Sequence, residues 1–223
     1  MAEAEQVQRD LVASDQRVLG PDNSWTAGAL SNLAYTLALE GRLADSEKVT
    51  REVLAIRSRA LGPENPYTLL SKSDLADVLF KEGHVYEAEK LQRETLEAMV
   101  RVVGPENAST LQEQSSLARI LIKEGRYPEA EKIAREAFEA LLRALGPQHP
   151  HTLDALRQLG TAMAHNGSYP EASRLFRDVM EKQDSSKGQG DRLSAWYDFA
   201  CVAEAANRPD DALKYLQEAI NRG

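Results

Sequence analysis

The chain has 223 residues, 42% of them hydrophobic and 28% charged, which is enough apolar material for a sizeable core. Its formal net charge of −8 disfavours nucleic acid as a partner, because an acidic chain repels phosphate backbones. It has no run of 18 apolar residues that would cross a membrane, and its acidic start at residues 1–5 is unlike a signal peptide, so no membrane partner is expected.

The chain contains one cysteine, Cys201. A single cysteine cannot form an internal disulfide, which suits a reducing compartment, and we therefore expect a cytoplasmic location. Because Cys201 lies within a helical apolar pattern, it is interpreted as a small, buried core residue.

A period of 42 residues runs through the sequence. Gly-Pro pairs begin at positions 20, 62, 104 and 146, so each follows the last by 42 residues. Three further series keep the same step, and they are the threonines at 26, 68, 110 and 152, the leucines at 33, 75, 117 and 159, and the glycines at 41, 83, 125 and 167. Agreement among independent residue types predicts a fold made of repeated units.

The period divides the chain into consecutive repeats of one continuous domain. Residues 1–20 match only the second half of a repeat, and they are expected to form a second helix without a first. The predicted repeats that follow are 21–62, 63–104, 105–146, 147–188 and a shorter one at 189–223. The polar stretch 183–191 is predicted to be a flexible linker.

Each repeat is predicted to hold two helices, as the repeat 63–104 illustrates. Asn65 is suited to cap a helix that starts at Pro66, where the missing N–H costs nothing. Gly83 is expected to end that helix, because glycine adopts a left-handed conformation without a clash, and Asn207 occupies the corresponding place in the last repeat. A second helix with acidic residues in its first turn follows and stops at the next Gly-Pro pair. His149 matches Asn65 and is likewise predicted to cap a helix.

The sequence resembles the tetratricopeptide repeat, in the 42-residue form of kinesin light chains and many bacterial repeat proteins. The resemblance rests on a large-small pair in the first helix, on a Trp and on a second-helix Ala, here Leu33-Ala34, Leu75-Ala76, Leu117-Ala118, Leu159-Gly160, Phe199-Ala200, Trp196, Ala88, Ala130, Ala172 and Ala212. Ser46 replaces that Ala in the first repeat. The resemblance covers nearly the whole chain and implies an all-α, right-handed α-solenoid of helix-turn-helix repeats that binds proteins or peptides.

Small residues are expected to control the packing of these helices. Ala or Gly at positions 34, 76, 118 and 160 would let the two helices of one repeat approach closely, since a bulky residue there would overpack. No repeat can bury its apolar face alone, so stability is expected to depend on neighbouring repeats. Trp25 and Trp196 are interpreted as packing residues.

No catalytic or metal-binding motif is recognisable. The sequence lacks a phosphate-binding glycine-rich motif, a nucleophile elbow and a zinc-binding His-Glu-x-x-His. His149 and His151 are close in sequence, but no cysteine or third histidine joins them. We therefore expect a chain that is not an enzyme and has no metal and no cofactor.

The resemblance also implies where a partner would bind. In the family, first helices line a concave face and usually hold an extended peptide. Helical spacing assigns to that groove Asn32, Tyr35, Asp77, Phe80, Lys81, Arg119, Ile122, Lys123, Arg157, Thr161, His165 and Tyr197. This lining is slightly basic, so one hypothesis is a groove for an acidic peptide, similar to the cargo groove of kinesin light chains. The alternative is that these charges are solvated on an exposed helix face.

Three functions remain open at this point. The first is a scaffold that recruits a partner peptide. The second is a regulatory or sensor segment of a larger bacterial signalling protein, such as a serine/threonine kinase, which the incomplete first repeat favours. The third is self-association, with a homodimer formed through the open ends of the solenoid.

Overall fold

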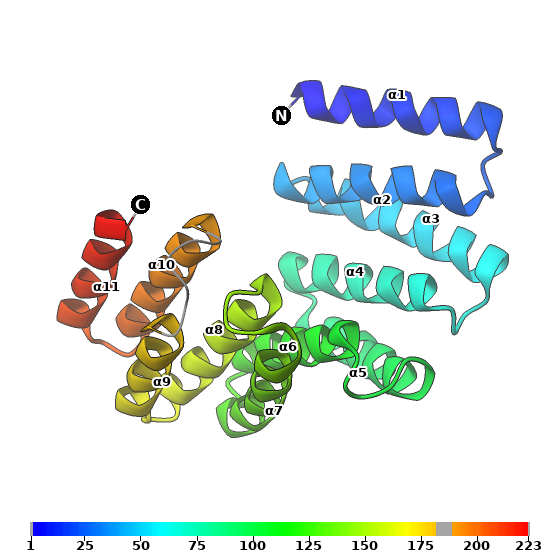
Figure 1. Ribbon diagram of the computed structural model, residues 1–223. Coiled ribbons are helices and arrows are strands. Elements are labelled where there is room, and N and C mark those ends of the chain that lie inside the picture. The colour runs from blue at the N-terminus through cyan, green and yellow to red at the C-terminus, as the bar shows by residue number, and fades with distance from the viewer. Residues whose placement is uncertain (1, 182–188, 223) are drawn as a thin grey trace. The chain divides into compact units, whose positions relative to one another are not determined.

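The computed structural model describes residues 2–181 and 189–222, which form eleven helices (Figure 1). The predicted all-α class is confirmed, because the described residues contain no strand. The chain separates into two compact units, residues 1–105 and 106–223, and each is described by itself. We call them the N-terminal unit and the C-terminal unit.

The N-terminal unit contains five helices. They are α1 (Ala2–Val18), α2 (Ser24–Leu39), α3 (Leu43–Leu61), α4 (Pro66–Glu82) and α5 (Val85–Val102). Each helix packs against the next along the chain, so α3 contacts both α2 and α4 (Figure 1). Leu30, Leu33 and Leu37 place one side of α2 in the core, where Val53 and Ile56 of α3 meet them.

The C-terminal unit contains six helices. They are α6 (Ala108–Lys123), α7 (Tyr127–Leu145), α8 (Pro150–His165), α9 (Tyr169–Glu181), α10 (Gln189–Ala205) and α11 (Pro209–Arg222). Here alternate helices also touch, since α8 contacts both α6 and α10. This unit therefore buries a larger apolar cluster, which extends from Leu111 of α6 to Ala219 of α11.

The helix ends agree with the predicted signals. Asn65 Oδ1 accepts a hydrogen bond from the backbone N–H of Tyr67 at 3.0 Å, and Asn23 and Asn107 cap α2 and α6 in the same way. His149 is confirmed as a cap, because its Nδ1 accepts from the backbone N–H of His151 at 3.2 Å. Gly83 ends α4 with φ 90°, and Asn207 has φ 56°, the only positive φ of a non-glycine residue that the structure describes.

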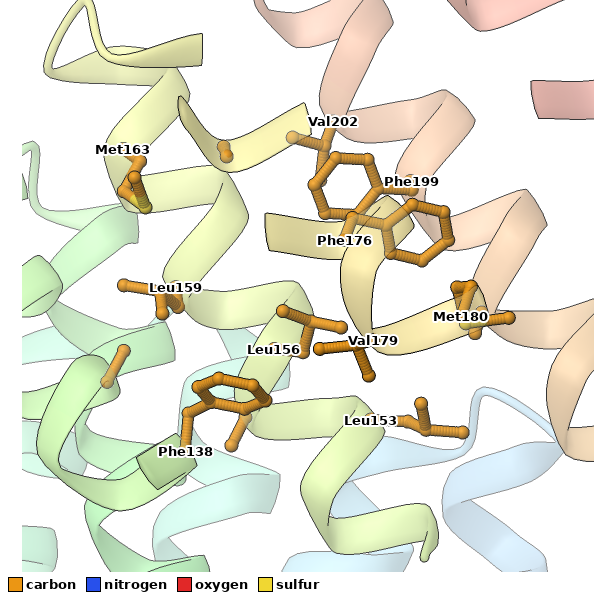
Figure 2. Close-up of a cluster of buried hydrophobic side chains, with 14 of the residues drawn as sticks. Phe138, Leu153, Leu156, Leu159, Met163, Phe176, Val179, Met180, Phe199 and Val202 are labelled. Carbon is orange, nitrogen blue, oxygen red and sulfur yellow. The ribbon is translucent and has the colours of Figure 1, made fainter. Parts of the chain in front are cut away.

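Aromatic rings fill the centre of the C-terminal core (Figure 2). Phe176 of α9 stacks on Phe199 of α10 with ring centroids 4.0 Å apart, and Tyr215 of α11 meets both rings edge-on at 5.5 Å. Trp196 is only 6% exposed and contacts the edge of Phe176, so its predicted packing role is confirmed. These contacts join α9, α10 and α11 into one apolar cluster.

Gly160 is small for a different reason from the predicted one. A Cβ at this position would lie 2.7 Å from Cε2 of Phe199 and 3.7 Å from Val202, and both residues belong to α10. The missing side chain thus admits an aromatic ring from the following repeat rather than the second helix of its own repeat. The clash would arise because Phe199 is held in place by the ring stack described above.

Trp25, expected to be a packing residue, and Cys201, expected in the core, lie on the surface instead. Trp25 in the first turn of α2 is 78% exposed, and Tyr67 at the matching place in α4 is also exposed. Cys201 is exposed although both its chain neighbours are buried. Cys201 aligns in the repeat with Tyr35 and Thr161, which lie on the outward face of the first helices. The repeat alignment therefore predicts the exposure of Cys201 better than the local apolar pattern does.

The predicted linker 183–191 is partly wrong. Residues 182–188 lie outside the described part of the chain, but residues 189–191 form the start of α10. Polar and acidic residues suit the first turn of a helix, where the dipole favours them. Polarity alone therefore did not distinguish a linker from a helix start.

Candidate functional site

The N-terminal unit has a cleft between α2, α3 and α4, with a volume of about 240 Å³. Four of the predicted groove residues line it, namely Asn32 and Tyr35 from α2 and Asp77 and Lys81 from α4. Phe80 does not line this cleft and is half-buried. We refer to this hollow as the N-terminal cleft.

Small side chains and the position of α3 leave this space open. Because α3 packs against both α2 and α4, it forms the floor of the cleft. On α2 the wall is built from Ser31, Ala34 and Ala38, none of which is long enough to fill the gap. At the floor, Ser46 is fully buried and its Oγ donates to the carbonyl oxygen of Ala34 at 2.8 Å. The Ser that replaces the repeat's usual Ala therefore ties α3 to α2.

Two carboxylates stand in the N-terminal cleft in different states. Asp77 accepts an ion pair from Lys81 at 2.7 Å on the same helix. Asp74 has no such partner. Desolvation of its carboxyl by the surrounding protein atoms raises its pKa to about 6, although the positive charge of Arg57 opposes this rise. Burial also lowers the pKa of Arg57, which donates to Ser71 Oγ at 2.7 Å. Asp74 was not among the predicted groove residues, yet its position 42 residues after Asn32 was a usable signal.

In the C-terminal unit, the first helices carry a charge cluster around Arg157 of α8. Its guanidinium lies 2.5 Å from Asp154 on the same helix and 3.6 Å from Asp198 of α10. Gln158 also donates to Asp154 at 3.2 Å. Burial raises the pKa of Asp198, and the charge of Arg157 opposes that rise. Arg157, predicted as a cationic groove residue, is thus already paired with two carboxylates.

The other predicted residues of the C-terminal unit differ in their surroundings. On α6, Arg119 and Ile122 are half-buried and Lys123 is exposed. Thr161 donates its hydroxyl to the carbonyl oxygen of Arg157 at 2.9 Å. The remaining two are aromatic, since His165 stacks on Tyr127 with ring centroids 4.4 Å apart, while Tyr197 is 59% exposed.

Both surfaces consist of polar, charged and aromatic side chains that are held on helices. Within residues 2–181 and 189–222, no group of three or more His, Cys, Asp or Glu side chains is placed to hold a metal ion. Among the helices described, none combines the length and apolar character needed to cross a membrane. What the surfaces offer is exposed charge, amide groups and aromatic rings that are fixed on helices.

Comparisons with known proteins agree with this architecture. A family model described as tetratricopeptide repeat matches residues 25–99 and 109–185, which together make up more than half of the chain. A crystal structure of repeats from a putative kinesin light chain of Podosopora anserina superimposes with a TM-score of 0.73 at 24% identity, covering 91% of this chain and 95% of that one. BtubC (BKLC) from P. vanneervenii gives a TM-score of 0.70 at 18% identity, covering 99% and 87%. These two likenesses concern the fold alone, and comparison with curated proteins found no match.

Proposed function

Because this chain belongs to the tetratricopeptide repeat family, whose repeats mediate protein–protein interactions, we propose that it is an interaction scaffold whose first helices bind an extended partner peptide. A scaffold of this kind carries no catalytic chemistry. Its binding residues are those of α2 and α4 in the N-terminal unit and of α6, α8 and α10 in the C-terminal unit. The family's usual role and the geometry of these helices both support the proposal.

The N-terminal cleft is the observation that carries this proposal. It brings together Asn32, Tyr35, Asp77 and Lys81, which lie on two helices and are 49 positions apart at most by sequence number. An exposed ring beside amide and charged groups is the kind of surface that binds a peptide, with polar groups setting orientation. Packing alone gives no reason for such residues to border a hollow.

An acidic partner segment is the finer part of the proposal, and it concerns the C-terminal unit. Arg157 is paired with Asp154 and Asp198, so it has little charge to offer a ligand. Lys123, which is exposed at the end of α6, would contribute to recognition of acidic side chains there, together with Arg119 one helical turn before it. The same face also carries the exposed ring of Tyr197.

A peptide-library selection on the intact chain tests this function. We expect enriched sequences whose binding, measured by calorimetry, is weakened by Tyr35→Ala or by the pair Arg119→Glu and Lys123→Glu. The matched control is the pair Lys132→Glu and Arg174→Glu, which makes the same charge change on the second helices α7 and α9. Circular dichroism verifies that each variant is folded.

Two results would overturn the proposed function. One is a library that yields no binding sequence. The other is a selected peptide whose affinity is unchanged by the variants on the first helices. An affinity that falls only in the control variant would place the binding surface on the second helices instead.

Self-association is a second candidate function, favoured by exposed apolar side chains on α1 and α11. Val7 and Val18 of α1 are 61% and 71% exposed, and Leu213 and Ile220 of α11 are 64% and 73% exposed. Burying such residues against a second copy would be favourable. Light scattering at two concentrations tests this, and a mass that stays monomeric at the higher concentration would exclude it.

A further inference from the structure

The serine and threonine hydroxyls that line the N-terminal cleft donate their protons within the chain. Ser31 donates to the carbonyl oxygen of Ala27 at 2.9 Å, and Ser46 donates to that of Ala34 at 2.8 Å. Thr50 donates to the carbonyl oxygen of Ser46 at 2.8 Å. Ser46 and Thr50 are buried, so of these three hydroxyls it is the half-buried Ser31 that can meet a ligand, and its oxygen can accept but has no proton to donate. The lining therefore favours a ligand that donates hydrogen bonds.

The carboxylates add to this preference. Asp77 is matched by Lys81, whereas Asp74 makes no hydrogen bond or ion pair with any residue that the structure describes. The positive charge of Arg57 on α3 lowers the pKa of Asp74, but its guanidinium donates hydrogen bonds to Ser71 Oγ and to the carbonyl oxygen of Tyr67. Asp74 is thus a carboxylate in a cleft without a hydrogen-bonding partner of its own.

An aromatic ring completes the lining. Tyr35 belongs to α2, on the opposite side of the cleft from Asp74 of α4, and it is 64% exposed. The face of a tyrosine ring attracts cations through its quadrupole. A carboxylate on one wall, a ring on the other and acceptor oxygens between them complement a positively charged donor.

We infer that the N-terminal cleft receives a cationic side chain, arginine or lysine, of a partner peptide. Both side chains only donate hydrogen bonds, so they match the carboxylate of Asp74 and the hydroxyl oxygen of Ser31. An acidic side chain would instead be repelled by the carboxylate of Asp74. The inference rests on the proposed peptide-binding function and adds a selectivity to it. The N-terminal cleft would bind a positively charged side chain of the partner, whereas α6 of the C-terminal unit itself presents positively charged side chains.

The test uses small probes so that it does not depend on finding the partner. Acetyl-arginine amide, acetyl-lysine amide and acetyl-citrulline amide are titrated into the isotope-labelled chain and followed by NMR. Citrulline has nearly the shape of arginine without its charge. We expect amide shifts in α2, α3 and α4 with arginine or lysine, and affinity about tenfold weaker with citrulline.

Asp74→Asn is the deciding variant, and it should weaken binding of the cationic probe about tenfold. Asp10→Asn is its matched control, because Asp10 is an exposed carboxylate of α1 that does not line the cleft. Lowering the pH should weaken binding as Asp74 takes up a proton. The other charged or titratable groups near Asp74 are those of Arg57 on α3, Asp77 and Lys81 on α4, and Tyr35 on α2.

Each outcome bears on the inference separately from the proposed function. Preference for arginine over lysine, or the reverse, supports it and names the side chain. Equal binding of citrulline, or unchanged binding by Asp74→Asn, overturns it, and so does the absence of shifts with both cationic probes. If the library yields groove-binding peptides while the cationic probes fail, the scaffold function stands and this selectivity falls.

Discussion

Replacing Gly160 by Ala tests how tightly α8 and α10 are packed. The added Cβ would lie 2.7 Å from Cε2 and 3.0 Å from Cζ of Phe199, which is closer than side chains normally approach. Phe199 cannot move away easily, because it is only 1% exposed and stacks on Phe176 at 4.0 Å. Overpacking of this kind costs about 1–3 kcal/mol.

The same substitution also restricts the backbone of the unfolded chain, so less conformational entropy is lost on folding, and this stabilises a helix by about 0.5–1 kcal/mol. The clash outweighs that gain, so Gly160→Ala should lower the free energy of unfolding by about 1 kcal/mol. Gly28 of α2 provides a matched control, because a Cβ there would meet no atom within 4 Å. Gly28→Ala should therefore raise the free energy of unfolding by about 0.5–1 kcal/mol.

Urea denaturation followed by circular dichroism measures both changes. Phe199→Leu should cost less in the Gly160→Ala background than in the parent chain, since the smaller side chain relieves the contact with the added Cβ. If Gly160→Ala stabilises the chain as much as Gly28→Ala does, the Phe199 ring moves away from the added Cβ without loss of stability, and α8 and α10 are not tightly packed there.

Three further changes have predictable effects. Asn65→Ala removes the cap of α4 and should lower the free energy of unfolding by about 1 kcal/mol, as measured by urea denaturation, and an unchanged value would show that solvent replaces the cap. Tyr215→Phe removes the buried 2.6 Å hydrogen bond to Ser173 and should cost about 1 kcal/mol in thermal denaturation, whereas a neutral result would mean that the bond adds nothing. The pKa of Asp74 is about 6 in the folded chain, above that of an unfolded aspartate, so its contribution to stability is present at low pH and lost as the pH rises through about 6. As the pH rises from about 4 to about 7, the stability of Asp74→Asn relative to the parent chain should increase by about 1 kcal/mol, a figure reduced for the exposure of the side chain. A stability difference that does not depend on pH would contradict the assignment.

The helical hairpins were predictable because their signals are local. A cap such as Asn65 or His149 acts on a backbone N–H two residues away, and Gly83 or Asn207 acts through its own φ angle. Such features need no knowledge of distant contacts. The 42-residue spacing then extends the assignment from one hairpin to its neighbours.

Contacts between repeats were harder to predict. Gly160 was assigned to packing within its own repeat, but its space is occupied by Phe199 of the next one. Residue type predicts a packing role for Trp25, but the side chain is 78% exposed. These outcomes depend on which side chain faces which, and a single sequence does not contain that information.

The candidate site shows the same division. Helical spacing placed Asn32, Tyr35, Asp77 and Lys81 on one face, and they do line one cleft. Spacing did not indicate that the charge of Arg157 would be taken up by Asp154 and Asp198, because ion pairing depends on rotamers and on the distance between helices. The net charge of a face was therefore a poor guide to the charge that it can offer a ligand.

NMR mapping of a bound partner peptide shows whether the first helices form the binding surface. An isotope-labelled sample of the chain is titrated with a peptide from the library, and shifted backbone amides are assigned. We expect the largest shifts in α2 and α4 or in α6, α8 and α10. Shifts confined to the outer surfaces of α3, α5, α7 and α9 would contradict it.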